Sequence, residues 1–147
     1  MNNPLELYPD PKSLLPHSGD ACWIGKVEAF SEEACECLCE VQTKNSELKS
    51  LGAVPNYFAL EYMAQTVGIY AGLSRRSKNL APKVGFIIGV RSLNCIADKF
   101  ALGEVLRIRA KKIWLDGTIG MFECSIFGTG NPQLLAQGTL SVYQMQD

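Results

Sequence analysis

Two side chains of the 147-residue sequence stand out as candidates for acid–base chemistry. His17 is the single histidine, and an imidazole is the side chain whose ordinary pKa suits a general base near neutral pH. Glu61 lies in an apolar stretch, with Gln65 one helical turn later on the same face. If the surrounding helix is buried, burial favours the protonated carboxyl unless a partner stabilises its charge, and such a group can donate a proton.

Each candidate also has a purely structural explanation. Glu61 could occupy an exposed strip of its helix or bond Gln65 for packing only, and His17 could be a turn residue that bonds backbone near Ser18 and Asp20. The element that must position Glu61 is a helix over residues 56–72. Asn56 can serve as its N-cap and Gly72 as its stop signal.

The remainder of the pattern is mostly strand-like. The predicted helix is apolar on all sides, which is typical of a helix buried on most of its surface. Around it the sequence predicts an arm at 1–12, a loop at 46–52, and strands at 22–30, 34–43, 84–94, 104–114, 119–127 and 134–145. This order predicts one α+β domain over residues 1–147, with an antiparallel sheet curling around one buried helix.

The six cysteines and the overall composition restrict the cellular context. Cys35, Cys37 and Cys39 alternate with polar or larger residues, so they share one face of a strand as core filler or as a thiolate metal site. No C-x-x-C pair is present, so we expect no metal site, and buried free thiols indicate a reducing, cytoplasmic compartment. No apolar run is long enough for a membrane span, and we expect no stable membrane insertion.

Charge is unevenly distributed although the net charge is −1. Residues 1–50 contain nine acidic and four basic side chains, whereas residues 74–112 contain two acidic and ten basic ones. A basic cluster follows the helix and consists of Arg75, Arg76, Lys78 and Lys83. It predicts an acidic partner, and no nucleic-acid-binding motif accompanies it. The cations of residues 107–112 are more typical of a solvated strand face.

Several segments, in order, resemble motifs of the hotdog-fold 3-hydroxyacyl-[acyl-carrier-protein] dehydratases. Residues 60–66 (LEYMAQT) resemble the E-A-M-A-Q motif of the central helix, and residues 14–17 (LLPH) resemble the N-terminal L-P-H segment. Residues 85–90 (GFIIGV) resemble the strand after the helix, and residues 102–104 (LGE) the next corner. The nearest likeness is to a divergent branch reading L-P-H-S-G-D and E-Y-M-A-Q, which is associated with aryl-polyene-type lipid pathways.

The resemblance implies a curved antiparallel sheet around a long central helix, in a dimer whose active sites form at the subunit interface. It implies fatty-acid-type chemistry without a cofactor: loss of water from a 3-hydroxyacyl thioester on acyl carrier protein, giving a trans-2-enoyl thioester. Glu61 transfers as a catalytic residue and Gln65 as its neighbour in the motif. The basic cluster would dock the carrier, and the predicted substrate contacts are Gln65, Asn56, Phe58, Met63 and Phe86.

One departure affects the expected mechanism. The typical enzymes carry a catalytic histidine fourteen residues before the helix glutamate, where this chain has Glu47. We therefore hypothesise that His17 replaces it and approaches the Glu61 of its own or a partner subunit. The histidine of the matching segment is not the catalytic one in the typical enzymes, so the structural role for His17 stays open.

Three functions remain to be separated. The leading one is a hydro-lyase that dehydrates carrier-bound 3-hydroxyacyl groups. A hotdog acyl thioesterase would instead use the helix carboxylate to activate water. A non-catalytic partner subunit of a dehydratase heterodimer would explain the missing loop histidine. We expect a homodimer or heterodimer in all three cases, because the exposed edge strands of a curved sheet need covering.

Overall fold

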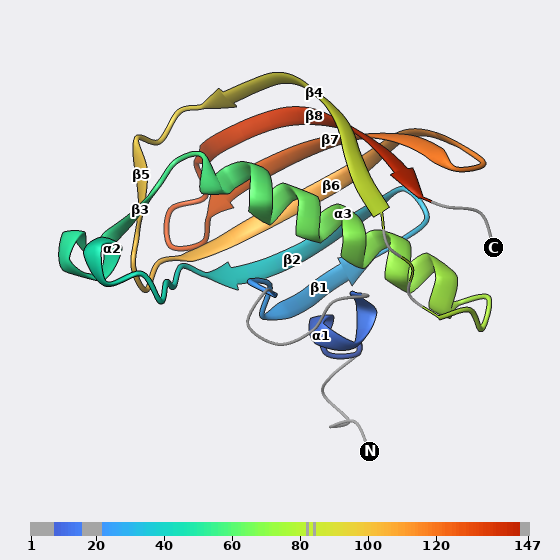
Figure 1. The fold of residues 1–147 in the computed structure, drawn as a ribbon, viewed down its shortest axis with the longest axis horizontal. Helices are drawn as coiled ribbons and strands as arrows, with labels where there is room; N and C mark the ends of the chain where they lie inside the picture. Colours follow the sequence, from blue (N-terminus) through green and yellow to red (C-terminus); the bar gives the residue numbers. More distant parts are fainter. Residues whose placement is uncertain (1–7, 16–21, 82, 84, 145–147) are drawn as a thin grey trace.

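The computed structural model describes residues 8–15, 22–81, 83 and 85–144 of the chain. Its helices are α1 (Pro11–Leu14), α2 (Ser46–Leu51) and α3 (Phe58–Arg76). Its strands are β1 (Lys26–Phe30), β2 (Ala34–Glu40), β3 (Ala53–Pro55), β4 (Gly85–Cys95), β5 (Lys99–Ala101), β6 (Val105–Asp116), β7 (Ile119–Gly128) and β8 (Leu134–Gln144). Figure 1 shows α3 lying along the concave side of a strongly curved sheet.

The main sheet has six strands in the order β1-β2-β6-β7-β8-β4, and every neighbouring pair is antiparallel. A second, two-stranded sheet pairs β3 with β5 beside the start of α3. β4 therefore follows α3 in sequence but joins the far edge of the sheet, beside the last strand. This crossing places the helix inside the curve of the sheet (Figure 1), as the sequence analysis predicted.

The alternation of β6 explains which side of the sheet faces the helix. Leu106, Ile108 and Ala110 are fully buried, whereas the arginines between them point to the convex side. There the Nε atom of Arg107 lies 3.0 Å from a carboxylate oxygen of Glu28, and that of Arg109 lies 3.7 Å from Glu36. The prediction of a solvated, charged strand face is confirmed for these two arginines.

The cysteines of β2 belong to the core. Cys35, Cys37 and Cys39 are at most 1% exposed, and the sulfur atoms of the first two lie 3.8 Å apart in a hydrogen bond. That bond and burial raise the pKa of the Cys37 thiol, and burial raises the pKa of Cys39 to about 12. The reading of these residues as core filler is therefore confirmed. Among the described residues, no cluster of three potential metal ligands is present.

A short N-terminal segment packs across the outer side of α3. Leu14 and Leu15 are buried against it, and α1 begins with the Asp10 side chain accepting a hydrogen bond from the backbone N–H of Lys12. Gly72 allows this contact, because a Cβ atom at that position would lie 2.3 Å from the backbone oxygen of Leu14. The predicted arm at 1–12 thus ends in a helix, and residues 1–7 lie outside the described part.

Several predicted boundaries were wrong. α3 begins two residues later than predicted and continues past Gly72 to Arg76, because Gly72 is there for the approach of Leu14 rather than as a stop. Tyr57, not Asn56, occupies the N-cap position, and it makes no side-chain capping bond. The predicted loop at 46–52 is largely helix α2, which Asn45 caps and Gly52 ends in a left-handed conformation.

The architecture is a hotdog fold: one long helix enclosed by a curved antiparallel sheet, as the resemblance implied. The large side chains of α3 that face the sheet are buried, and Tyr62 and Tyr70 make ring contacts with Phe100 and Phe122 respectively. Each buried side chain of that size contributes about 1.5–3 kcal/mol to folding. None of the helices in the described part of the chain is long and apolar enough to cross a membrane.

Candidate active site

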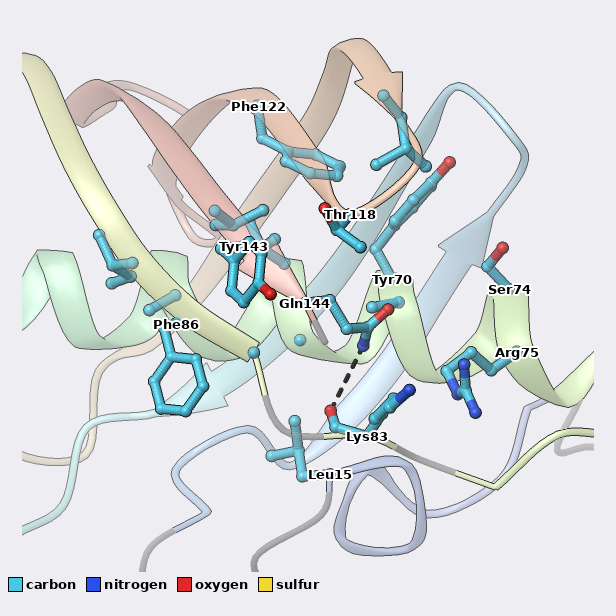
Figure 2. A pocket seen from close by; sticks show the side chains of 18 of the residues that line it. Leu15, Tyr70, Ser74, Arg75, Lys83, Phe86, Thr118, Phe122, Tyr143 and Gln144 are labelled. Carbon is cyan, nitrogen blue, oxygen red and sulfur yellow. Dashed lines mark hydrogen bonds between the residues drawn. The ribbon is translucent and has the colours of Figure 1, made fainter. Parts of the chain in front are cut away.

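A pocket of about 450 Å³ lies between one side of α3 and the part of the sheet formed by β4, β8 and the adjoining ends of β6 and β7. α3 contributes lining residues from Glu61 to Arg75, and Lys78 follows in the turn after the helix. The other walls are Leu15, the first residues of β4, the last residues of β8 and the turn between β6 and β7. Figure 2 shows these elements converging around the pocket, with side chains from each directed toward it. Segments distant in sequence therefore form one elongated cavity along the helix.

Glu61 and Gln65 both line this pocket, and they are hydrogen-bonded to each other. The Gln65 amide nitrogen Nε2 donates to Glu61 Oε1 over 3.3 Å, while its oxygen Oε1 accepts from the backbone N–H of Trp23 over 2.7 Å. Gln65 is 4% exposed and spans the space between α3 and the segment before β1. It therefore fixes one carboxylate oxygen of Glu61 relative to that segment.

The prediction that the helix buries Glu61 was wrong. Its side chain is exposed, because it lies at the wall of an open pocket instead of in the packed core. The alternative in which Glu61 lies on an exposed strip and bonds Gln65 describes the geometry correctly. A carboxylate at the wall of a largely apolar pocket can still exchange a proton with a bound ligand. The structure thus keeps Glu61 available to a ligand while holding one of its oxygen atoms in place.

Apolar and aromatic side chains form much of the pocket wall. Phe86 and Ile87 come from β4, Phe122 from β7 and Tyr143 from β8. The Tyr70 hydroxyl donates to the backbone oxygen of Glu32 over 2.6 Å, and burial is the main cause that raises its pKa. This lining suits the hydrocarbon part of a ligand better than a strongly hydrated one.

The far end of the pocket, beyond the middle of α3, is basic. Three members of the predicted basic cluster line it, namely Arg75, Lys78 and Lys83, whereas Arg76 does not. The Arg75 Nε atom donates to the backbone oxygen of Ala81, which ties the guanidinium to the turn after α3. The structure therefore connects most of the basic cluster to the same cavity as Glu61, which the sequence alone did not indicate.

The predicted substrate contacts divide into two groups. Gln65 and Phe86 line the pocket, whereas Asn56, Phe58 and Met63 do not. Asn56 donates a side-chain hydrogen bond to the backbone oxygen of Ala97, and Phe58 stacks on neighbouring rings. Met63 is fully buried between α3 and the sheet. His17, the second predicted catalytic residue, lies outside the described residues.

The sequence analysis missed several residues that shape the site. Leu15 and the backbone N–H of Trp23 were not predicted, since a backbone donor carries no sequence signal. A usable signal was the run of small residues on the Glu61 side of the helix, which consists of Ala64, Gly68 and Ala71. Small side chains repeated every three to four residues leave space beside a helix.

Comparison with solved structures gives the site a context. The chain aligns with "The Dehydratase Heterocomplex ApeI:P from Xenorhabdus doucetiae" at 28% identity and a TM-score of 0.84, over 95% of this chain and 93% of that one. It also shares its fold with a hypothetical thioesterase with coenzyme A from Streptococcus pneumoniae, at 15% identity and a TM-score of 0.63. That match covers 83% of this chain and 86% of the thioesterase.

A third similar structure is smu.793 from Streptococcus mutans bound to acetyl CoA, at 15% identity and a TM-score of 0.62, over 82% of this chain and 88% of that one. No curated protein sequence shows significant similarity to the chain. The family model named ApeP dehydratase matches residues 9–147, almost the whole chain. The chain therefore belongs to the ApeP-like dehydratase family.

Proposed function

We propose that this protein removes water from a 3-hydroxyacyl thioester carried on acyl carrier protein, giving a trans-2-enoyl thioester in cytoplasmic fatty-acid or aryl-polyene-type lipid biosynthesis. The observation that carries the proposal is the Glu61 carboxylate, held by Gln65 at the wall of an apolar pocket in a dehydratase family. The reaction breaks the C2–H and C3–O bonds and forms a C2–C3 double bond. A base takes the C2 proton, and an acid protonates the leaving hydroxyl group.

Glu61 is the proposed acid, and Gln65 and Phe86 are the proposed contacts with the substrate. The Gln65 amide donates to one oxygen of the Glu61 carboxyl, which leaves the other oxygen to carry the proton and meet the substrate hydroxyl. Phe86 lies at the apolar wall, where it can contact the acyl chain. No metal or organic cofactor takes part in this proposal.

His17 is the proposed base. The described residues on both sides of it contact α3 close to Glu61. Leu15 lines the same pocket beside Gly68, and the Trp23 N–H is bonded to Gln65. His17 is the single histidine of the sequence, so it is the residue proposed to act beside the Glu61 of its own or a partner subunit.

The chain is proposed to function as a dimer with a second hotdog subunit that meets it at β4. Among the described residues this strand pairs only with β8, and it leaves Phe86, Ile87, Ile88 and Val90 between 40% and 58% exposed. β1, at the opposite edge, has only five residues and carries Lys26 and Glu28. A long apolar edge needs a partner strand, whereas a short charged edge does not.

A non-catalytic partner role is the second candidate. Similarity to a dehydratase heterocomplex specifically favours it, because one subunit of such a pair can supply groups that the other lacks. Similarity to thioesterases at 15% identity supports only the fold, so hydrolysis is not proposed. The basic cluster, including Arg76 on its outer side, is the proposed docking surface for the acidic carrier protein.

Mass spectrometry of a 3-hydroxyacyl-carrier-protein tests the proposal. We expect loss of one water with the wild-type chain, and a decrease of at least about 100-fold in rate for Glu61→Gln and for His17→Ala. Arg109→Gln is the matched control, since Arg109 lies on the convex side of the sheet. Loss of water only after a histidine-bearing hotdog partner is added would assign this chain the partner role. Release of free acid instead of water would contradict both candidates.

A further inference from the structure

The basic end of the pocket contains more hydrogen-bond donors than an acyl chain needs. Ser74 and Arg75 come from α3, Lys83 precedes β4, Thr118 lies in the β6–β7 turn and Gln144 ends β8. Figure 2 shows these five side chains around the cavity, with Ser74 and Arg75 on the side away from Phe86. Polar groups from four separate segments therefore converge at one place.

Hydrogen bonds between these segments hold the convergence in place. The Gln144 backbone N–H donates to the backbone oxygen of Thr118 over 2.7 Å, and its side-chain Nε2 donates to the backbone oxygen of Lys83 over 3.4 Å. The Arg75 Nε atom is bonded to the backbone oxygen of Ala81. The Arg75 guanidinium and the Lys83 backbone are thus held in place before a ligand arrives. Less conformational entropy is then lost when a ligand orders these two side chains.

Charge separates the two ends of the cavity. Glu61 is the one acidic side chain among its described lining residues, and three basic side chains stand at the other end. Fourteen residues separate Glu61 from Arg75, and at the standard helical rise this is roughly 21 Å along α3. A ligand that spans the pocket therefore meets a carboxylate at one end and cations at the other.

We propose that the basic end of the pocket is an anion-binding site for an elongated thioester substrate whose reacting end lies at Glu61. Arg75, Lys78 and Lys83 supply the positive charge, and the Ser74 and Thr118 hydroxyls can donate to anionic oxygen atoms. This inference rests on the proposed function, because it takes Glu61 as the position of the reacting atoms. It adds a substrate feature that dehydration itself does not require: an anionic oxygen group distant from the thioester.

Two parts of such a substrate could supply that group. The phosphodiester of a phosphopantetheine arm is one, since it lies at the opposite end of the arm from the sulfur atom that carries the acyl group. An acidic group at the distal end of the acyl chain is the other, and the apolar side chains of the pocket wall suit its hydrocarbon part. Both sources present the same chemistry to the basic end.

Four non-reactive ligands distinguish these sources. Each is a 3-hydroxyacyl pantetheine in which an amide replaces the thioester, made with or without the terminal phosphate and with or without a carboxylate at the end of the acyl chain. Binding to the full-length protein, together with its hotdog partner where one co-purifies, is measured by calorimetry at two salt concentrations. We expect one anionic group to tighten binding about 10- to 100-fold, and less at high salt.

The Arg75→Gln/Lys83→Gln double variant should lose that gain, whereas Arg109→Gln should keep it. A gain from the phosphate supports the site with the arm as its ligand, and a gain from the carboxylate supports it with the acyl end. Affinities within twofold for all four ligands would overturn the inference. Dehydration without anion discrimination contradicts this inference alone, whereas anion discrimination without dehydration contradicts only the proposed function.

Discussion

Along α3, the side chains packed into the core are large and buried, whereas the more exposed side chains that line the pocket are small or charged. Tyr62, Met63 and Ile69 on the first side are fully buried. The second side presents Glu61 and Arg75, with small residues between them. Both sides belong to the same nineteen-residue helix, so helix formation itself does not distinguish them.

On this one helix, the residues that stabilise the fold are therefore different from the residues that are available for chemistry. Burial of the sheet-facing side supplies the apolar contacts that hold α3 in the curve of the sheet. The small side chains that line the pocket make fewer apolar contacts. The space that they leave forms part of the cavity beside Glu61. Substitutions on the two sides should therefore act on different measurements, and the predictions below test that division.

The largest effect on stability is expected from Met63→Ala. Removing this fully buried side chain leaves a cavity between α3 and the sheet, and it should lower the free energy of unfolding by about 3 kcal/mol. Glu61→Gln, on the other side of the same helix, should change it by less than about 0.5 kcal/mol. Urea denaturation measures both values. Equal destabilisation by the two variants would show that the two sides do not differ in the way proposed.

A glycine pair on the outer side of α3 gives the next effect. A Cβ atom at Gly72 would lie 2.3 Å from the backbone oxygen of Leu14, whereas one at Gly68 would lie 2.9 Å from the side-chain atom Cδ2 of Leu15. A backbone atom cannot move aside as a side chain can. Gly72→Ala should therefore destabilise the protein by about 1–2 kcal/mol, although alanine favours helices.

Gly68→Ala is the matched control for that variant. The Leu15 side chain can rotate away, so the gain in helix propensity should offset the contact and leave stability within about 0.5 kcal/mol of wild type. Thermal and urea denaturation measure both variants. If Gly72→Ala were as stable as Gly68→Ala, the close packing of the N-terminal segment on α3 would be contradicted.

The same comparison explains what the sequence could predict. Alternation in β6 and the long apolar helix depend on local periodicity, so the strands, the helix and the α+β class were predictable. β3 and β5 have three residues each and exist only because they pair with each other, so no local pattern indicated them. Gly72 was misread because its contact with Leu14 is tertiary and looks like a stop signal in the sequence.

The sequence predicted which residues form the site better than it predicted their burial and their surroundings. Glu61 and Gln65 were identified from their spacing, and the structure brings them together in a hydrogen bond. The burial of Glu61 was predicted wrongly, because an apolar sequence on all sides of a helix does not reveal which side the sheet covers. The joining of Glu61 and the basic cluster in one cavity depends on the places of β4, β8 and the β6–β7 turn.

Gln65 lies at the boundary between the two sides of α3, and its substitution should lower stability less than Met63→Ala does. It is buried like the sheet-facing residues but bonds Glu61 and the Trp23 N–H like a site residue. Gln65→Leu keeps the apolar volume and removes both bonds. It should destabilise the protein by about 1 kcal/mol and lower the rate of dehydration about tenfold.

Thr66→Val is the control for Gln65→Leu, because Thr66 is the neighbouring buried polar residue. Its hydroxyl donates to the Tyr62 backbone oxygen, 2.9 Å away, and also interacts with the buried Cys37 thiol. This variant should cost about 1 kcal/mol or less and leave the rate of dehydration unchanged. A rate equally lowered in both variants would mean that Gln65 acts on catalysis only through stability. A lowered rate in Gln65→Leu alone would identify Gln65 as the residue that positions the Glu61 carboxyl for proton transfer.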